Sequence, residues 1–565
     1  MASESQLDVV FCWHMHQPDY RDHLRNEFQQ PWVYLHGIKD YIDMAAHLEA
    51  VPAARVVVNF SPVLLDQLRD YDEQIQGYLT DDKPITDPLL AMLDSPVFPA
   101  DNEHRVSLVK ACLRSNRKRL IERFKPYLKL TEIAQPIIQD LSYSAYLSNQ
   151  FMADLITWYH LAWLGETVRR SDQRVINLIE QGSGFTLHQR RMLLEVIGEL
   201  ITGLRERYAK LAETGRVELA MSPYAHPMVP LLLHFSDAKD SMPDIRLPVL
   251  DSYPGGKDRA RWHLNKGLDI FTEYFGQRPV GCWPSEGGIS SATIKLLDKA
   301  GFQWLATGEN VLRNSINNSN AGKKIKSIFN GFQAKEYGIK LFARDDTLSD
   351  LIGFTYADWH ADDAVADLIH RLEIIADQTP NRGNNVVSII MDGENAWEYF
   401  PDNGYYFISA LYQRLAEHPR LRMATYRDVL KKQQVHLDQV TAGSWVFGNF
   451  STWIGDEDKN RAWDILGDVK RVYDECRDKL SAEQLAKVDT QLAVCEGSDW
   501  FWWFGDYNPA DTVSDFERLF RLHVANLYHL LGHEPPQYLS QTISHGSGTG
   551  GPALGGVIRP GNPAS

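Results

Sequence analysis

Two short apolar segments of the chain lead into carboxylates that can act together in catalysis. Residues Val386 to Met391 are largely apolar or β-branched, and Asp392-Gly393-Glu394 follows them directly. The segment Gly281 to Trp283 breaks at a proline and leads to Glu286. Two carboxylates from different strands suit cleavage of a glycosidic bond, in which a protonated acid assists the leaving oxygen while the second, ionised carboxylate attacks carbon or activates water. The residue pattern leaves the two roles unassigned, and it also allows Asp392-Gly393 to be only a solvated turn.

Histidines and tryptophans accompany these carboxylates. His14 and His16 share one face of a predicted first strand through its period of two. They fit contacts to sugar hydroxyls, ligands to a metal ion, or buried core histidines. Trp283 and Trp397 stand close to the two carboxylates in sequence, and flat aromatic faces suit sugar rings.

Two further candidates each have a purely structural alternative. Glu218 belongs to a predicted third strand and is either a functional acid or a surface acid near the strand's start. Trp500 and Trp502 stand in an aromatic-rich segment, residues 499–504. That segment forms either the core of a helical domain or a platform that closes over a sugar.

A parallel barrel is the architecture that would bring these residues together. Buried strands that alternate with helix-like segments indicate a parallel sheet with right-handed crossovers. Functional residues follow several of the strands, at the end where the strands of such a barrel all point. We therefore predict an α/β fold with a seven-stranded (β/α)7 barrel, whose strands are Val9 to Trp13, Arg55 to Phe60, Val217 to Met221, Val280 to Trp283, Gln303 to Ala306, Leu351 to Thr355 and Val386 to Met391.

Outside the barrel, the sequence predicts helices and a disordered C-terminal tail. We expect the catalytic barrel to span residues 1–410, with a helical insertion at about 61–215. The strands are expected to stop near residue 410, and residues 411–540 then form a C-terminal helical domain that completes the active site. Two of its helices are predicted to open with capping boxes at Ser481 and Ser514, and Gly532 to follow the last. Residues 541–565 are rich in Gly, Pro and Ser and predict a disordered tail, in which a G-x-G-x-x-G match follows no strand.

The composition of the chain bears on which partners it can bind and in which cellular compartment it works. A net charge of -16 without a basic run argues against a nucleic-acid partner. The five cysteines are scattered without C-x-x-C spacing, which favours a reducing compartment over a disulfide framework. We see neither a signal peptide nor an 18-residue apolar run, so we expect a cytoplasmic protein without a membrane contact.

Five ordered motifs resemble those of glycoside hydrolase family 57. The resemblance extends from His14 to about Gly505, and the residues of the motifs are most similar to those of the α-amylase and amylopullulanase branch. The motifs are His14-Met15-His16-Gln17-Pro18, Gly215-Arg216-Val217-Glu218, Trp283-Pro284-Ser285-Glu286, Asp392-Gly393-Glu394-Asn395-Ala396-Trp397 and Glu496-Gly497-Ser498-Asp499-Trp500-Phe501-Trp502-Trp503.

The resemblance implies roles that the residues alone do not. It implies a retaining mechanism with Glu286 as nucleophile and Asp392 as general acid/base, and it implies sugar contacts for His14, His16, Glu218 and Glu394. The expected substrate is a starch-like or glycogen-like α-glucan with α-1,4 bonds, and no cofactor is expected, although calcium at an acidic loop stays open.

Three other activities remain open. A 4-α-glucanotransferase or a glycogen branching enzyme uses the same chemistry with a sugar acceptor. A metal-dependent barrel hydrolase or deacetylase would use the two histidines as ligands, and a non-catalytic protein would only bind glucan. Activity on α-1,6 bonds and the oligomeric state are not decided by the sequence.

Overall fold

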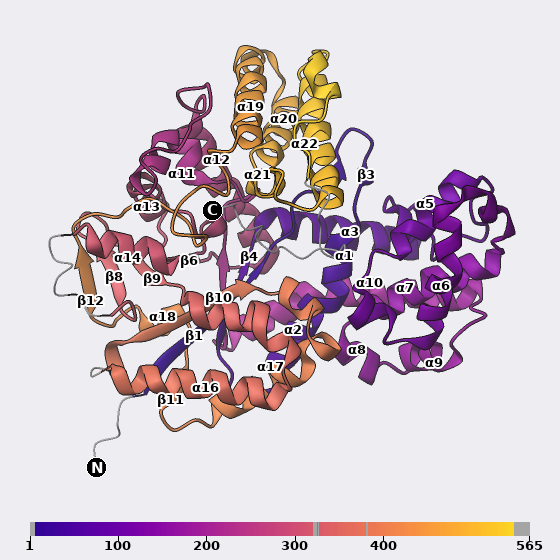
Figure 1. The fold of residues 1–565 in the computed structure, drawn as a ribbon, viewed down its shortest axis with the longest axis horizontal. Helices are drawn as coiled ribbons and strands as arrows, with labels where there is room; N and C mark the ends of the chain where they lie inside the picture. The colour runs from indigo at the N-terminus through magenta and orange to yellow at the C-terminus, as the bar shows by residue number, and fades with distance from the viewer. Residues whose placement is uncertain (1–5, 320–324, 326, 380–381, 547–565) are drawn as a thin grey trace.

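A parallel barrel forms the centre of the molecule (Figure 1). The computed structural model describes residues 6–319, 325, 327–379 and 382–546. Seven parallel strands follow the order β10-β1-β4-β5-β6-β7-β9. A parallel bridge between Arg344 and Ser388 joins the two ends of that order and closes the barrel. The strands are β1 (Leu7–Met15), β4 (Val56–Phe60), β5 (Val217–Met221), β6 (Gly281–Cys282), β7 (Trp304–Thr307), β9 (Lys340–Ala343) and β10 (Val386–Asp392).

The predicted (β/α)7 barrel is therefore confirmed, but one of its strands was wrongly assigned. Leu351–Thr355 is a turn of π-helix that continues directly from helix α15 (Asp346–Asp350). Asp345 caps that helix by accepting a hydrogen bond from the backbone N–H of Leu348. The sixth barrel strand is instead β9, a strand of four residues that begins with a lysine. A short apolar run fits a buried helical turn as well as a strand, which is why the pattern misled.

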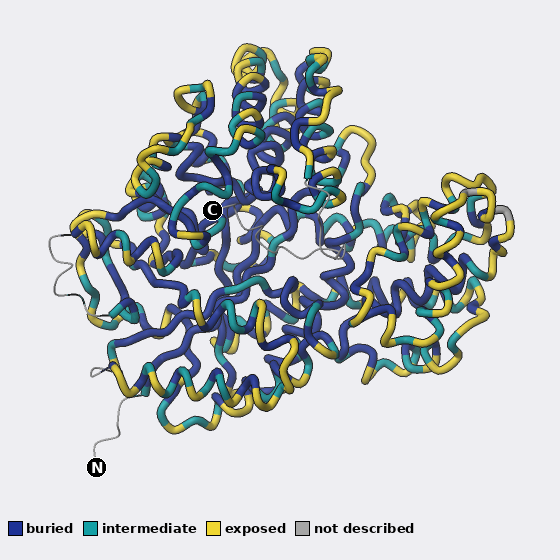
Figure 2. Tube along the Cα trace, in the orientation of Figure 1, coloured by how far each residue is buried: buried dark blue, intermediate teal, exposed yellow. Residues whose placement is uncertain are grey.

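Side chains fill the barrel, and helices cover it. Val10 and Cys12 of β1, Val57 of β4 and Ala220 of β5 belong to one buried apolar cluster, set by the alternation of side chains along each strand. Figure 2 shows the same concentration of buried backbone at the strands. The helices between and after the strands include α1 (Trp32–His36), α2 (Ile42–Ala50), α11 (Val229–Leu233), α12 (Gly256–Phe275), α13 (Ser291–Lys299), α14 (Glu309–Asn317), α16 (Ala361–Gln378), α17 (Tyr405–Ala416) and α18 (Tyr426–Val429).

The long connection between β4 and β5 is helical, as predicted, and lies beside the barrel (Figure 1). Thr186 opens its longest helix with a capping box in which Gln189 is the reciprocal partner. The helices of this insertion are α3 (Pro62–Asp81), α4 (Pro88–Ala91), α5 (Asn102–Cys112), α6 (Lys125–Gln139), α7 (Asn149–Trp163), α8 (Glu166–Ser171), α9 (Gln173–Gln181) and α10 (Leu187–Glu213).

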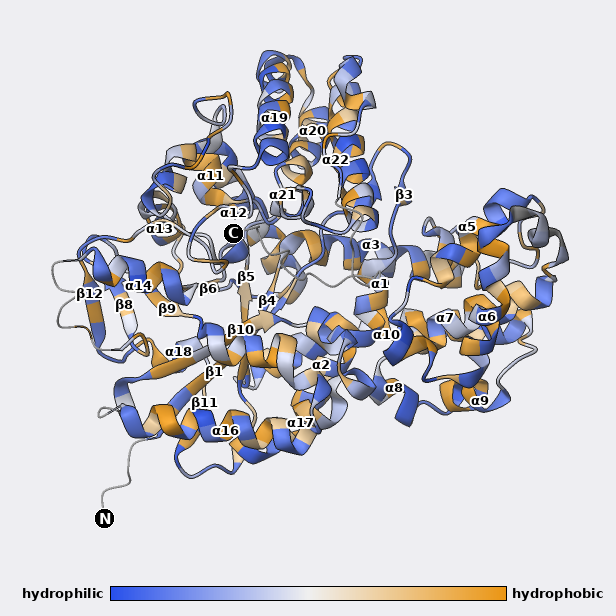
Figure 3. Cartoon of the chain, viewed as in Figure 1, coloured by the Kyte–Doolittle hydropathy of each residue, from blue (hydrophilic) through white to orange (hydrophobic). Residues whose placement is uncertain are grey.

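The C-terminal helices stand over one end of the barrel (Figure 1), and the cartoon in Figure 3 shows both hydrophilic and hydrophobic residues along them. The capping box at Ser481 is confirmed. The one at Ser514 is wrong, because the last helix already begins at Ala510 and Ser514 lies inside it. Gly532 follows that helix with φ +77°, a conformation that favours glycine. The helices are α19 (Glu457–Cys476), α20 (Ala482–Cys495), α21 (Ser498–Trp503) and α22 (Ala510–Leu530).

Strands continue past residue 410, contrary to expectation. β11 (Leu421–Met423) pairs with β1, and β12 (Gln434–Leu437) pairs with β8 (Gly331–Ala334). These strands extend the sheet beyond the barrel order, and β8 meets β9 antiparallel.

The predicted disordered tail is wrong for its first residues. Ile543 and Ser544 are buried, and the backbone N–H of Ile543 donates to Glu517 of α22. The backbone N–H of Gly505 donates to Ser544 Oγ. Residues 547–565, with most of the G-x-G-x-x-G match, lie outside the described residues.

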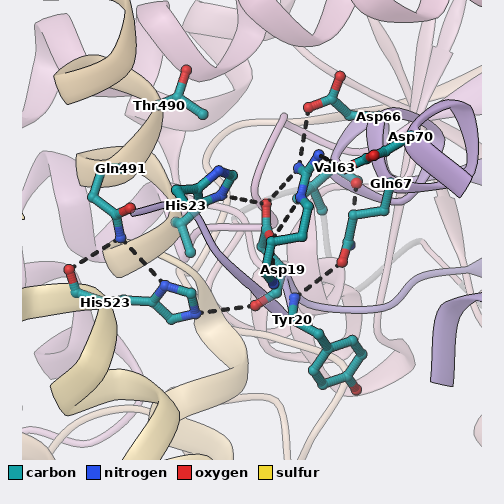
Figure 4. A network of polar contacts seen from close by, with 12 residues as sticks. Asp19, Tyr20, His23, Val63, Asp66, Gln67, Asp70, Thr490, Gln491 and His523 are labelled. Carbon is teal, nitrogen blue, oxygen red and sulfur yellow. Dashed lines mark hydrogen bonds and ion pairs between the residues drawn. The ribbon is translucent and has the colours of Figure 1, made fainter. Parts of the chain in front are cut away.

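A polar network fixes the segment that follows β1 (Figure 4). Asp19 accepts from Arg21 at 2.7 Å and from His23 at 3.2 Å, and its backbone oxygen contacts His523 of α22 at 3.1 Å. Gln67 of α3 donates to the backbone oxygen of Pro18. The network thus joins the start of the insertion and the C-terminal helices to the loop that carries His16, just before the hairpin of β2 (Arg21–Asp22) and β3 (Glu27–Phe28).

In the described part of the chain, no helix is both long enough and apolar enough to cross a membrane.

Candidate active site

One cavity at the carboxyl ends of the strands collects most of the predicted site residues. Asp392 is the last residue of β10, and His14 pairs with it in register on β1. Glu286 stands in the turn that follows β6. His16 and Glu394 line the same cavity as these three. Parallel strands point one way, so residues far apart in sequence meet at this end of the barrel.

Glu286 combines an unusual backbone conformation with a carboxylate that two hydrogen-bond donors orient. Its φ of +58° lies in the left-handed region, which a glutamate adopts only when the surroundings impose it. The indole N–H of Trp445 donates to Glu286 Oε2 at 3.1 Å, and the hydroxyl of Ser498 donates to Oε1 at 3.2 Å. The carboxylate is therefore oriented from both oxygens.

Two of the cavity's carboxylic acids, Glu286 and Asp392, bind protons more tightly than free ones. Burial, together with the negative charge of Asp499, raises the pKa of Glu286 to about 8, and the charge of Asp392 adds to the rise. Burial also raises the pKa of Asp392, against the hydrogen bond that Asn395 donates to Oδ2 at 2.8 Å. The charge of Asp392 is thus one cause of the raised pKa of Glu286, so the protonation states of the two acids depend on each other.

Three histidine rings form a stack along one wall of the cavity. The centroid of the His226 ring lies 3.9 Å from that of His16 and 5.0 Å from that of His14. Burial and the neighbouring rings lower the pKa of His226 well below its usual value, and the pKa of His14 to about 3. These two rings are therefore neutral and offer hydrogen bonds rather than charge.

Polar partners orient each histidine. His14 Nδ1 lies 2.7 Å from Asn59 Oδ1, and His226 Nδ1 lies 2.9 Å from Ser498 Oγ. Both ring nitrogens of His16 are engaged, because Nε2 lies 2.9 Å from Asp499 Oδ1 and Nδ1 lies 2.7 Å from Ser61 Oγ. Such partners fix a ring and its tautomer, so the opposite nitrogens of His14 and His226 can face a ligand.

A metal ion has one candidate set of ligands here, and it differs from the expected one. Donor atoms of His16, His226 and Asp499 all lie within 4.8 Å of one another. His14, the other residue of the H-x-H spacing, contacts Asn59 instead and is not part of this set. Two imidazoles and one carboxylate would suit a divalent transition metal.

Glu394 lines the cavity with one oxygen already engaged. Its Oε1 accepts from the backbone N–H of His16 at 3.1 Å and from Gln17 at 3.3 Å. Its Oε2 is buried and accepts no hydrogen bond from the described residues. Burial and the charge of Asp392 raise the pKa of Glu394 well above its usual value, so this side chain favours the protonated form.

The four predicted tryptophans divide between the cavity and the core. Trp283 and Trp502 line the cavity. Trp397 does not, because it is buried against Trp13, at a centroid distance of 5.7 Å, and against Phe400. Trp500 is likewise a core residue, whose indole N–H donates to the backbone oxygen of Val494. These two residues are thus placed away from a substrate.

Glu218 is also placed away from the cavity. It is the second residue of β5, about 10 Å before the strand's end at 3.3 Å per residue. Its Oε1 accepts from the indole N–H of Trp304 at 2.7 Å, and its Oε2 accepts from the backbone N–H of Arg427 at 2.8 Å. The acid is neither a surface residue nor a lining residue: it is a buried structural acceptor.

Several lining residues were not predicted. His226 and Asp499 stand inside segments that the sequence singled out, after β5 and in the aromatic-rich stretch, so a signal was present. Arg344 directly follows β9, the strand that was missed. Trp445 comes from a loop after β12 with no pattern of its own, and only the folded chain brings it to Glu286.

The fold and the site, with carboxylates among histidines and tryptophans, are those of a carbohydrate-active barrel enzyme. The sequence model of Glycosyl hydrolase family 57 matches residues 10–440, and the protein belongs to that family of glycoside hydrolases and transferases. No curated protein sequence matches the chain significantly.

Solved structures share the fold at low identity. An α-amylase, AmyC, from Thermotoga maritima superposes with a TM-score of 0.57 at 13% identity, covering 95% of this chain and 96% of its own. A GH57-type branching enzyme from Pyrococcus horikoshii superposes with a TM-score of 0.56 at 16% identity, covering 94% of this chain and 93% of its own. A GH57 branching enzyme from Thermococcus kodakaraensis superposes with a TM-score of 0.55 at 14% identity, covering 93% of this chain and 90% of its own. The fold is common to both activities and does not separate them.

Proposed function

We propose that the protein is a retaining α-glucan hydrolase that cleaves α-1,4-glucosidic bonds of starch-like or glycogen-like chains. The observation that carries the proposal is the carboxyl group of Glu286, oriented by Trp445 and Ser498 in the cavity that also holds Asp392. Family membership supports the chemistry, and the α-amylase among the similar structures is consistent with it.

The reaction proceeds in two displacements. Glu286, ionised, attacks the anomeric carbon while the glycosidic bond breaks and Asp392 gives its proton to the leaving oxygen. Asp392, now ionised, takes a proton from water as the water oxygen attacks the same carbon and the bond to Glu286 breaks. Two inversions retain the α configuration.

The other residues of the cavity bind the sugar at the cleavage point. The neutral imidazoles of His14 and His226 and the protonated Glu394 offer hydrogen bonds to hydroxyl groups, and Trp283 and Trp502 offer apolar ring faces. The chemistry proposed here uses no cofactor and no metal ion.

Substitution of the nucleophile tests the proposal. We expect Glu286→Gln to abolish release of reducing ends from amylose and maltoheptaose while circular dichroism and the melting temperature show an intact fold. Ser498→Ala is a milder companion that removes one of the two hydrogen bonds and should lower kcat without abolishing it. Turnover by Glu286→Gln at more than a few per cent of the wild-type rate would rule out the assigned role.

Transfer to a sugar acceptor is the second candidate. Residues of the C-terminal helices and of the loop that carries Trp445 cover Glu286. A glycosyl-enzyme that is covered in this way is reached less easily by water, which favours its attack by a bound sugar acceptor. The products from maltoheptaose decide between the two: a 4-α-glucanotransferase yields longer oligomers, and a branching enzyme introduces α-1,6 linkages. A hydrolase yields only shorter oligomers.

Assays with chelator and with polysaccharide address the remaining alternatives. A metal-dependent hydrolase built on His16, His226 and Asp499 would lose activity with a chelator and regain it with zinc. A non-catalytic binder would retain glycogen yet release no reducing ends. The cytoplasmic location is part of the same proposal and rests on the scattered, unpaired cysteines.

A further inference from the structure

A second cavity continues from the catalytic one. The two share His16, Asn395 and Asp499 as lining residues. The second cavity then extends between the insertion, at Lys110 of α5, and the first turns of α22. In Figure 1 the β2–β3 hairpin lies between these two groups of helices. Gln17, Pro18 and Tyr20, which precede the hairpin in the chain, line the cavity.

The lining suits a neutral chain of hydroxyl-bearing rings. Gln17 and Gln30 supply amides, and Thr512 and Ser514 supply hydroxyls. Trp503, which also lines the cavity, stacks on Phe516 at a centroid distance of 5.2 Å and an interplanar angle of 21°. Charged side chains line the cavity as well, namely Lys110, Arg114, Asp499, Asp511 and Asp515. Sugar hydroxyls hydrogen-bond to charged and to neutral groups, and sugar rings pack on aromatic faces.

The ion pair of Arg114 and Asp515 spans this second cavity. Arg114, from just after α5, contacts Asp515 of α22 at 2.6 Å, so the pair connects the insertion to the C-terminal helices. Arg114 also donates to Gln30 Oε1 at 3.1 Å, and its guanidinium carbon lies 5.3 Å from the centroid of the Trp32 ring. Three contacts hold the guanidinium in place, although its side chain is partly exposed.

Arg114 stands between the second cavity and a third one. The third cavity lies over the insertion and is lined by Leu89 and His104 among others. Gln30, Trp32 and Arg114 line both cavities. The side chain of Arg114, beside Gln30 and Trp32, therefore stands where the second cavity meets the third.

We propose that the second cavity binds the glucan chain beyond the cleavage point, and that the Arg114–Asp515 pair ends this groove and sets the chain length the enzyme uses best. This inference rests on the proposed action on α-glucans. Removal of the guanidinium widens the connection between the second and third cavities beside Gln30 and Trp32, which gives further glucose units contacts along the insertion.

Rates on maltooligosaccharides of defined length test the proposal. The variants are Arg114→Ala, Asp515→Ala and the charge-exchanged double variant Arg114→Asp/Asp515→Arg. The measured quantity is the kcat/KM on an oligomer of about ten units divided by that on maltotetraose. We expect Arg114→Ala to raise this ratio about three- to tenfold, the factor of one further neutral hydrogen bond, and the double variant to return it toward the wild-type value.

A matched control separates groove length from the loss of any surface ion pair. Arg174 of α9 pairs with Glu199 of α10 at 2.6 Å on the insertion, and neither residue lines a cavity described above. Arg174→Ala should leave the ratio unchanged. A ratio within a factor of two of wild type in Arg114→Ala, with an unchanged melting temperature, would refute the proposal. A wild-type protein inactive on every α-glucan would refute the proposed function instead.

Discussion

Trp445 and Glu286 are joined twice, through side chain and backbone. The indole N–H of Trp445 donates to Glu286 Oε2 at 3.1 Å, and its backbone N–H donates to the backbone oxygen of Glu286, also at 3.1 Å. The two residues are separated by 159 positions. The pairing fixes both the orientation of the proposed nucleophile and the left-handed turn that presents it.

This pairing predicts a shift in the pH dependence of activity. The hydrogen bond from Trp445 stabilises the ionised form and so opposes the rise in the pKa of Glu286. Trp445→Phe removes the donor and raises that pKa further. Because the nucleophile acts ionised, we expect the acidic limb of kcat/KM against pH to move to higher pH. Trp502→Phe, which keeps the Glu286 contact, should leave the limb in place, and a shift to lower pH in Trp445→Phe would contradict this account.

Azide should reveal the role of Asp392. In Asp392→Ala no group donates a proton to the leaving oxygen, so we expect kcat on amylose to fall by about 10²–10⁴. α-Maltosyl fluoride, whose leaving group requires no proton, should still form the glycosyl-enzyme. Azide then replaces water in attacking it, and the product is an α-glycosyl azide, identified by NMR. A β-glycosyl azide would instead assign Asp392 as the nucleophile.

Glu286 should also make stability depend on pH. Its pKa is raised from an ordinary value of 4.5 to about 8, so the folded protein holds this proton more tightly than the unfolded chain. The contribution to stability is complete below pH 4.5 and is lost as the pH rises through 8. Glu286→Gln has no such loss. We expect its melting temperature to match wild type near pH 4 and to exceed it by about 2–4 °C near pH 8.5, as measured by calorimetry. An equal difference at both pH values would contradict a raised pKa.

The sequence predicted those parts of the fold whose signal is local. Val386 to Ile390 are buried throughout, and a continuous apolar run of that kind marks a barrel strand on its own. The capping box at Ser481 likewise depends on residues three positions apart. β9 was missed because four residues beginning with a lysine carry too little periodicity, whereas the nearby run Leu351–Thr355 is apolar and helical.

The active site was predictable where a strand end marks it. Asp392 and His14 lie at the ends of strands, and Glu286 lies in the turn after one. Because parallel strands end on the same side of a barrel, the predicted strands were enough to place these residues close together. Trp445 depends on the packing of a loop from a distant part of the chain, which no short pattern encodes. Glu218 was expected to contact the sugar, but the structure places it outside the cavity. Its place in a motif does not show how far along the strand it lies, and it is the second residue of β5 and not the last.

Glu218 therefore offers a direct comparison between a structural and a substrate-binding role. Glu218→Ala leaves the indole N–H of Trp304 and the backbone N–H of Arg427 without their acceptor inside the protein. At about 1–3 kcal/mol for each buried donor left unpaired, we expect a loss of about 2–5 kcal/mol in the free energy of unfolding, measured by denaturant titration. Glu218→Gln keeps one acceptor oxygen and should lose less. Because the side chain does not line the catalytic cavity, the KM for maltoheptaose should stay within a factor of two in both variants. A severalfold rise in KM in Glu218→Gln, with an unchanged free energy of unfolding, would restore Glu218 as a sugar contact.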